Sequence, residues 1–293
     1  MDWLLEPLDV SFIQRALIGG FAVALLCAIV GTWVVLRGMA FLGDAMSHGM
    51  LPGIAIALLL GGNPVVGAAI SAGAMAFGVC AMSRHRRLSH DTSIGLLFVG
   101  MLAAGVIIIS RSRSFAVDLT GILFGDILAV KYSDIWLLCG VLAATAVVAV
   151  IFHRPFTALA FDGRKAATLG MRPDLAAPVL LLLVTGAMAG SFQVVGTLLV
   201  FGLLIAPPAA ALPWAKSIPA VMGIAAVLGC VSVLAGILLS WHARTAAGAT
   251  IAATAVALFF LSSAVKAAWP LLRQRRSSPT TPNSTGTTAA LIR

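Results

Sequence analysis

Long apolar runs without charge dominate this sequence and limit the folds that it can adopt. No Asp, Glu, Lys or Arg occurs between residues 16 and 36 or between residues 49 and 82. A helix of about 20 apolar residues matches the hydrocarbon thickness of a bilayer. Of the 293 residues, 60% are hydrophobic and only 10% are charged, and the mean hydropathy is +1.06. We therefore predict an all-α, polytopic membrane helical bundle.

Apolar segments and the turn residues between them place the spans. The pattern predicts eight or nine spans, at residues 12–36, 42–61, 64–82, 93–110, 134–152, 176–195, 197–213, 218–240 and 248–269. Within the seventh, Pro207 and Pro208 remove two successive backbone donors. We expect this to be a proline-broken segment whose break faces the protein interior, because lipid cannot satisfy a broken backbone. The alternative is that the two prolines end a span at the membrane interface.

The basic residues indicate how the chain is oriented. They cluster at 83–90, at 153–172 and at 273–276, and the positive-inside rule predicts that all three are cytoplasmic. The net charge of +9 therefore reflects short loops, and without a basic stripe with interleaved aromatics we expect no nucleic-acid partner. Residues 1–270 form one predicted transmembrane domain, and residues 271–293 a basic, disordered cytoplasmic tail. Residues 114–131 are predicted to form a surface-lying or re-entrant helix.

Motifs for nucleotide hydrolysis and for common enzymatic sites are missing from the sequence. No Gly-Lys dipeptide occurs, which excludes a P-loop, and the single glutamate, Glu6, excludes an HExxH zinc site. The four cysteines are scattered singly through apolar segments, as expected of packing residues. We therefore expect a chain that is not an enzyme and has no permanently bound cofactor.

Asp44 and His48 are ionisable residues inside an apolar stretch. A charged side chain at membrane depth costs about 3 kcal/mol or more, so such residues usually serve a function. Their spacing of four residues places both on one face of a helix. A carboxylate and an imidazole are suitable ligands for a divalent transition metal. The alternatives are a proton relay and a charged pair at the interface that orients a span.

The polar loop at 153–174 is the second informative element. Residues 157–172 fit a short amphipathic helix that is closed by Gly170. Its apolar residues Leu159, Phe161 and Leu169, which flank Asp162, need a surface to bury against. That surface is either a partner protein or the membrane interface, and periodicity does not separate the two.

Four segments, in order, resemble permease subunits of bacterial ABC transporters for zinc, manganese or iron uptake. The residues from Val34 to Ala55, with Asp44 and His48, are similar to the second-span signature of that family. The segment Leu123–Val130 is similar to the region between its fourth and fifth spans, and Val195–Ala210 to its proline-broken segment. The loop with Asp162 and Gly170 falls where the family's coupling helix lies. The resemblance runs from about residue 12 to residue 270.

The resemblance implies a function and a set of partners. It implies a permease homodimer in the lipid of the cytoplasmic membrane, a separate cytoplasmic ATP-binding subunit and an extracytoplasmic metal-binding protein. ATP would act on the partner subunit and be coupled through residues 155–170. The transported divalent metal (Zn, Mn or Fe) would pass Asp44 and His48. Carboxylate and imidazole ligands suit the three metals about equally.

One position departs from the family pattern. Where the family usually has an aspartate followed by a proline, this chain has Arg244 and Ala246. If that aspartate contributes to cation handling, Arg244 does not, and the substrate could differ. Within this architecture, the alternative is an ABC permease for a chelated metal or an organic cofactor. The alternatives from other classes are a proton-coupled secondary transporter and a membrane anchor for a surface assembly.

Overall fold

The structure is a computed structural model that describes residue 7 and residues 10–83, 90–110, 127–161 and 173–276. This part of the chain is helical without a β-strand. Its elements, in order, are α2 (Ser11–Leu36), α3 (Phe41–Gly49), α4 (Leu51–Leu59), α5 (Pro64–Ser83), α6 (His90–Ser110), η2 (Ile127–Ala129), α8 (Tyr132–Ile151), α9 (His153–Phe161), α11 (Pro173–Val195), α12 (Thr197–Ala211), α13 (Ile218–Ala243) and α14 (Ala247–Arg276).

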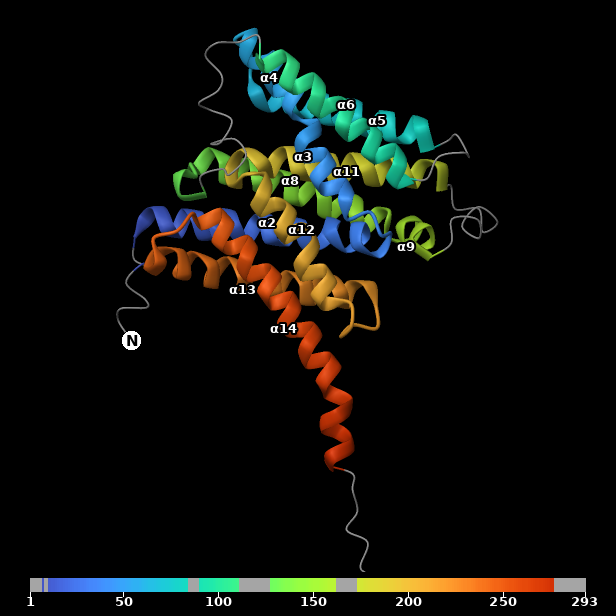
Figure 1. Ribbon diagram of the computed structural model, residues 1–293, viewed down its shortest axis with the longest axis vertical. Helices are drawn as coiled ribbons and strands as arrows, with labels where there is room; N and C mark the ends of the chain where they lie inside the picture. The colour runs from blue at the N-terminus through green and yellow to red at the C-terminus, as the bar shows by residue number, and fades with distance from the viewer. Residues whose placement is uncertain (1–6, 8–9, 84–89, 111–126, 162–172, 277–293) are drawn as a thin grey trace, which may run out of the picture.

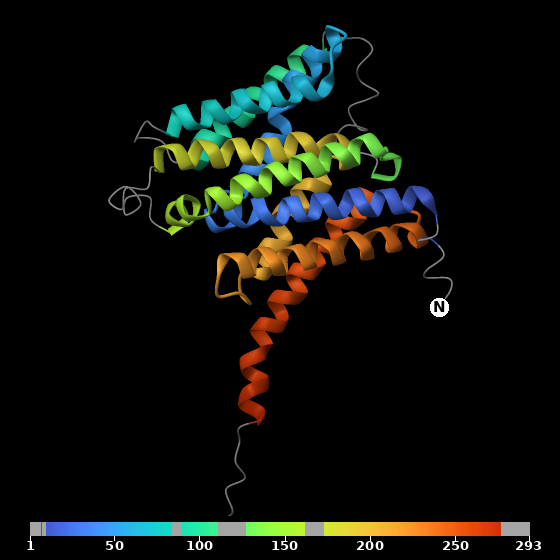
Figure 2. The same ribbon diagram turned by 180° about the vertical axis from the view of Figure 1, so that it is seen from behind.

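The helices form a single bundle in which α2 is central (Figure 1). α4, α5 and α6 lie on one side of α8 and α11, and α12, α13 and α14 lie on the other side, as the reverse view confirms (Figure 2). α2 packs against α8, α12 and α13. Most of α2 is accordingly buried, including Trp33, which has no exposed surface.

The predicted membrane fold is confirmed. Within the described residues, eight helical segments are long and apolar enough to cross a membrane, counting α3 and α4 as one, and α12 is a shorter apolar helix. The predicted ranges differ from the observed helices by a few residues at either end. Of the predicted helix at 114–131, the structure describes the end, where η2 is a short 3-10 turn.

The interruption that we expected at the tandem proline lies instead at Gly196. α12 continues through Pro207 and Pro208 to Ala211. The chain breaks before it, where Gly196 has φ 79° and ψ 162°, a left-handed φ that glycine adopts without strain. Each proline deprives one carbonyl of its helical donor, those of Leu203 and Leu204, and α12 ends three residues after Pro208. α12 therefore stays helical through both prolines.

Glycines allow helices to approach to backbone contact at two places. At Gly31, in α2, a β-carbon would collide with the carbonyl oxygen of Leu204 in α12. That carbonyl is one of the two that the prolines deprive of a donor, so the close approach places Cα–H groups beside it. Gly53 of α4 and Gly67 of α5 face each other in the same manner, each against the carbonyl oxygen of the other. Small residues at helix interfaces are common in membrane proteins for this reason.

α14 is the helix that departs furthest from the bundle. Its first half packs against α12 and α13, and Ser262 Oγ donates a hydrogen bond of 2.9 Å to the carbonyl of Ala210. The C-terminal part of the helix runs away from the other helices (Figure 1). It continues to Arg276, so the first residues of the predicted disordered tail, 271–276, are helical instead. Leucine, glutamine and arginine, which make up this stretch, favour helix. Residues 277–293 lie outside the described residues.

Candidate functional site

The candidate site lies on α3, the first half of the second span. The span is interrupted at Met50, between α3 and α4, because Pro52 at the start of α4 cannot donate to the helix behind it. Ser71 of α5 donates a hydrogen bond of 2.6 Å to the carbonyl of Gly49, next to the interruption. Asp44 and His48 occupy the two turns immediately before it.

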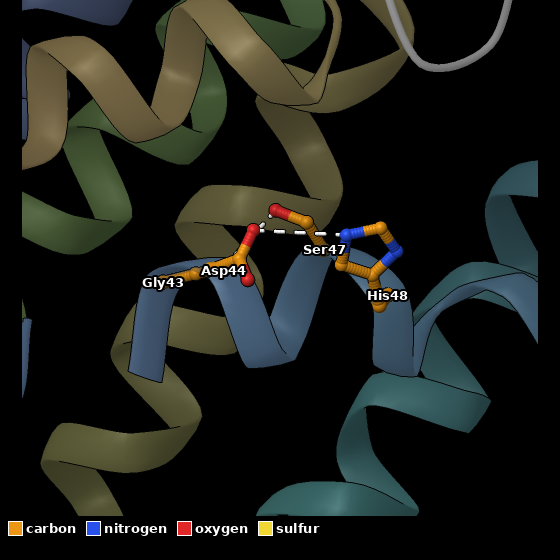
Figure 3. A network of polar contacts seen from close by, with 4 residues as sticks. All are labelled: Gly43, Asp44, Ser47 and His48. Atoms are coloured by element: carbon orange, nitrogen blue, oxygen red, sulfur yellow. Dashed lines mark hydrogen bonds and ion pairs between the residues drawn. The ribbon is translucent and has the colours of Figure 1, made fainter. Parts of the chain in front are cut away.

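Asp44 and His48 point toward each other on the less buried side of α3. The opposite side of the helix is in the core, through residues such as Leu42 and Met46. His48 Nε2 lies 3.7 Å from Asp44 Oδ1, and the two side chains are 27% and 36% exposed, respectively. Figure 3 shows one imidazole nitrogen directed at the carboxylate and the other directed away from it. The predicted pairing on one helix face is therefore present in the geometry.

The separation of the two atoms suits a shared cation better than a direct hydrogen bond. At 3.7 Å, the pair exceeds the usual hydrogen-bond distance of about 2.7–3.2 Å. An ion about 2.1 Å from both atoms would bridge them at an angle of roughly 120°. Ser47 does not compete for this position, because its hydroxyl donates to the carbonyl of Gly43 at 3.0 Å.

The pair provides two ligands for a metal ion. The second nitrogen of its histidine lacks the hydrogen bond that usually orients a metal-binding imidazole. In the described part of the chain, no group of three or more His, Cys, Asp or Glu residues is arranged to hold a metal. His48 Nδ1 is buried without a hydrogen-bond partner. A histidine in a permanent metal site almost always donates from its second nitrogen to a carboxylate, a carbonyl or water. The pair therefore supplies two of the ligands that a divalent metal ion needs.

The predicted coupling loop is described only in its first part. α9 ends at Phe161, and Asp162, Leu169 and Gly170 lie outside the described residues. Leu159 is partly buried and packs against the main core, so part of the surface that it needs is intrachain. α9 is fixed to the end of α2 by Trp33, whose ring centroid lies 5.6 Å from that of Phe156. The helix is thus attached firmly to the transmembrane bundle.

The two prolines do not join the Asp44–His48 pair. Both are buried, and Pro208 Cγ lies 3.1 Å from where a β-carbon on Gly31 would be. α12 does reach α3 one turn earlier, where Leu204 and Phe201 lie over Gly43. The same helix therefore carries the two prolines and contacts Gly43, the residue that precedes Asp44.

Sequence reasoning missed three features around the site. The first is the interruption at Met50, which Pro52 indicates in the sequence although the predicted span at 42–61 is continuous. Phe98 of α6, whose ring packs on His48, had no signal in the sequence. Arg37, in the turn before α3, has an Nη1 that is buried without a hydrogen-bond partner, and burial lowers the pKa of its guanidinium.

Arg244 lies at the opposite end of the bundle from α9. It ends α13 in a left-handed conformation (φ 52°, ψ 44°), and it is the only described non-glycine residue with a positive φ. It lines a cavity of about 530 Å³ together with Trp241, His242 and Thr245. The structure does not bring Arg244 to the Asp44–His48 pair.

Comparisons with known proteins agree with this architecture. The chain matches the ABC 3 transport family over residues 9–266. It is 35% identical to the "Manganese transport system membrane protein MntC" of Halalkalibacterium halodurans, with 88% of each chain covered. It is 34% identical to the "Probable iron transport system membrane protein" of Haemophilus influenzae, with 90% of this chain and 97% of that one covered.

A solved structure shows the same fold. It is that of PsaBC from Streptococcus pneumoniae in complex with Fab, to which this chain is similar with a TM-score of 0.80 and 31% identity. The match covers 94% of this chain and 99% of that chain. With the apolar helices, these likenesses identify a multi-pass cell membrane protein. The chain belongs to the ABC 3 transport family of transport permeases.

Proposed function

We propose that this chain is the permease subunit of an ABC importer that moves a divalent metal ion across the cytoplasmic membrane. The observation that carries the proposal is the Asp44–His48 pair, whose facing atoms are 3.7 Å apart within an apolar span. A carboxylate and a neutral imidazole bind Mn(II), Fe(II) and Zn(II). Relatives named for manganese or iron transport support the first two.

The permease works with other subunits in this proposal. ATP is hydrolysed by a separate cytoplasmic subunit, an extracytoplasmic protein delivers the metal, and two copies of the permease surround the pathway. A second copy also suits the chemistry, because one Asp44–His48 pair supplies two ligands and divalent metals take four or more. The alternative substrate is a chelated metal. It is supported by a relative named "Chelated iron transport system membrane protein YfeD" of Yersinia pestis.

The test is ATPase stimulation by metal in the complete transporter. The permease, its ATPase subunit and its binding protein are reconstituted in liposomes, and hydrolysis is measured with Mn²⁺, Fe²⁺, Zn²⁺ and a ferric chelate in turn. Stimulation by one free ion together with its accumulation supports the proposal. Stimulation by the chelate alone favours the alternative. Uptake that follows a proton gradient without ATP contradicts both.

We expect Phe161→Asp to detach the ATPase subunit from α9. Phe161 ends the described helix of the coupling loop, and a carboxylate in an apolar contact costs several kcal/mol. The ATPase subunit should co-purify poorly, and transport should be lost while the permease remains in the membrane. Phe161→Leu is the matched control and should be mild, since most of the apolar area remains. Wild-type co-purification of Phe161→Asp would leave the loop as an interfacial helix.

We expect the double variant Pro207→Ala, Pro208→Ala to impair transport more than assembly. Alanine restores two backbone donors, which would draw the carbonyls of Leu203 and Leu204 back into α12 and away from Gly31. The measurement is metal uptake relative to the amount of permease in the membrane. Single cysteines at positions 204–210, in a background without the native cysteines, test whether water reaches this stretch. Uniform protection together with normal uptake would contradict the prediction.

A further inference from the structure

An aromatic side chain from a neighbouring helix packs against the ring of His48. The ring centroid of Phe98, in α6, lies 5.3 Å from that of His48, with an angle of 76° between the planes. Phe98 is fixed in turn by Phe41, at 5.5 Å and 70°. Both are edge-to-face contacts, the arrangement that aromatic rings prefer. Phe98 and Phe41 therefore form an aromatic wall beside the Asp44–His48 pair.

The imidazole needs such a contact because its polar groups do not fix it. The terminal torsion of histidine is broad, so the plane of the ring can rotate and direct Nε2 away from Asp44. In most metal sites a hydrogen bond from the second nitrogen prevents this rotation. His48 Nδ1 has no such partner, and the 3.7 Å contact with Asp44 is too long to replace it. Packing is the remaining restraint on the ring.

We propose that Phe98 is a positioning residue for the transported ion, whose ring performs the orienting role that a hydrogen-bond acceptor usually has. Edge-to-face packing against His48 restrains the plane of the imidazole to the orientation in which its edge faces Asp44, so less reorientation is needed when the ion arrives. The proposal rests on the proposed function and adds a residue of α6 to the metal pathway. It also gives α6 a direct influence on how well the pair binds an ion.

The test is Mn²⁺ binding to the purified full-length permease, followed by the loss of the free-ion signal in electron paramagnetic resonance. Phe98→Leu retains an apolar side chain but removes the ring. An aromatic pair of this kind is worth about a threefold to tenfold change in an equilibrium constant. We therefore expect Kd for Mn²⁺ to rise by about that factor, and KM for uptake by the complete transporter to rise with Vmax nearly unchanged.

The matched control is Phe77→Leu, because Phe77 is a phenylalanine of α5 that is 76% exposed on the outside of the bundle. It should leave Kd and KM unchanged. A double-mutant cycle separates positioning from general packing. If Phe98 acts through His48, then Phe98→Leu has little further effect on Kd in a His48→Ala background. Phe98→Met, whose flexible side chain adapts to irregular gaps, replaces leucine if that variant does not fold.

Two results would overturn the inference. One is a Kd for Phe98→Leu equal to that of the wild type, and the other is an effect of the same size in both backgrounds. The proposed function fails separately, if His48→Ala or Asp44→Asn binds Mn²⁺ and transports it normally. A transporter that needs Asp44 and His48 but tolerates Phe98→Leu would retain the proposed function and reject only the role of Phe98.

Discussion

We expect Asp44→Asn to abolish metal uptake while the amount of permease in the membrane stays nearly unchanged. Asparagine keeps the size of the side chain but removes the charge that binds a divalent cation. Loss of an outer-shell partner alone costs about 10–100-fold in metal affinity, so loss of a direct ligand should reduce uptake by more than about 100-fold. The measurement is uptake of radiolabelled manganese and iron at equal expression. His48→Ala should act similarly.

The matched control for this prediction is Asp134→Asn. Asp134 lies in the first turn of α8, where its carboxylate accepts a hydrogen bond of 3.0 Å from the backbone N–H of Lys131. Asparagine can accept the same hydrogen bond, so the helix start is preserved and uptake should be normal. Normal uptake by Asp44→Asn or His48→Ala would show that the ion does not use the pair.

We expect Gly31→Ala to destabilise the bundle. The added β-carbon has no free space, because the carbonyl of Leu204 and the ring of Pro208 occupy it. α2 and α12 would have to separate, and α2 is the central helix of the fold. Overpacking of this kind costs about 1–3 kcal/mol and occasionally more, and a rigid backbone neighbour favours the upper end. A lower melting temperature in detergent and reduced abundance in cells would show the effect.

Gly140→Ala provides the comparison with an open site. Gly140 lies within α8, and a β-carbon there would meet no atom within 4 Å. Alanine is the better helix former, so stability should rise by up to about 1 kcal/mol. If the two variants melted at the same temperature, the close packing of α2 on α12 would not matter for stability.

The apolar spans could be predicted from the sequence, because a bilayer imposes a strong and local requirement on every segment that crosses it. Asp44 and His48 could be identified for the same reason, since charges are rare among such residues. Interactions between distant segments could not be predicted from the sequence. Phe98 is 50 residues from His48, and nothing in the sequence around either one specifies their contact.

The backbone breaks were harder to place than the helices. Proline is a visible signal, but its effect depends on where it lies. Pro52 separates two helices within a span, whereas Pro207 and Pro208 near the end of α12 do not interrupt it. Gly196, one of 29 glycines, carries the break, and its special φ is a result of the packing around it.

The buried, unpartnered Nδ1 of His48 has a consequence for the speed of the transporter. A hydrogen-bond acceptor at this nitrogen would make the imidazole a stronger ligand, by about 10–100-fold in affinity. Because differences in affinity appear mainly in the dissociation rate, the ion would remain on the pair longer by a similar factor. Each permease would then pass fewer ions per second. On the proposed function, an imidazole without an acceptor at Nδ1 would therefore bind each ion more weakly and release it sooner.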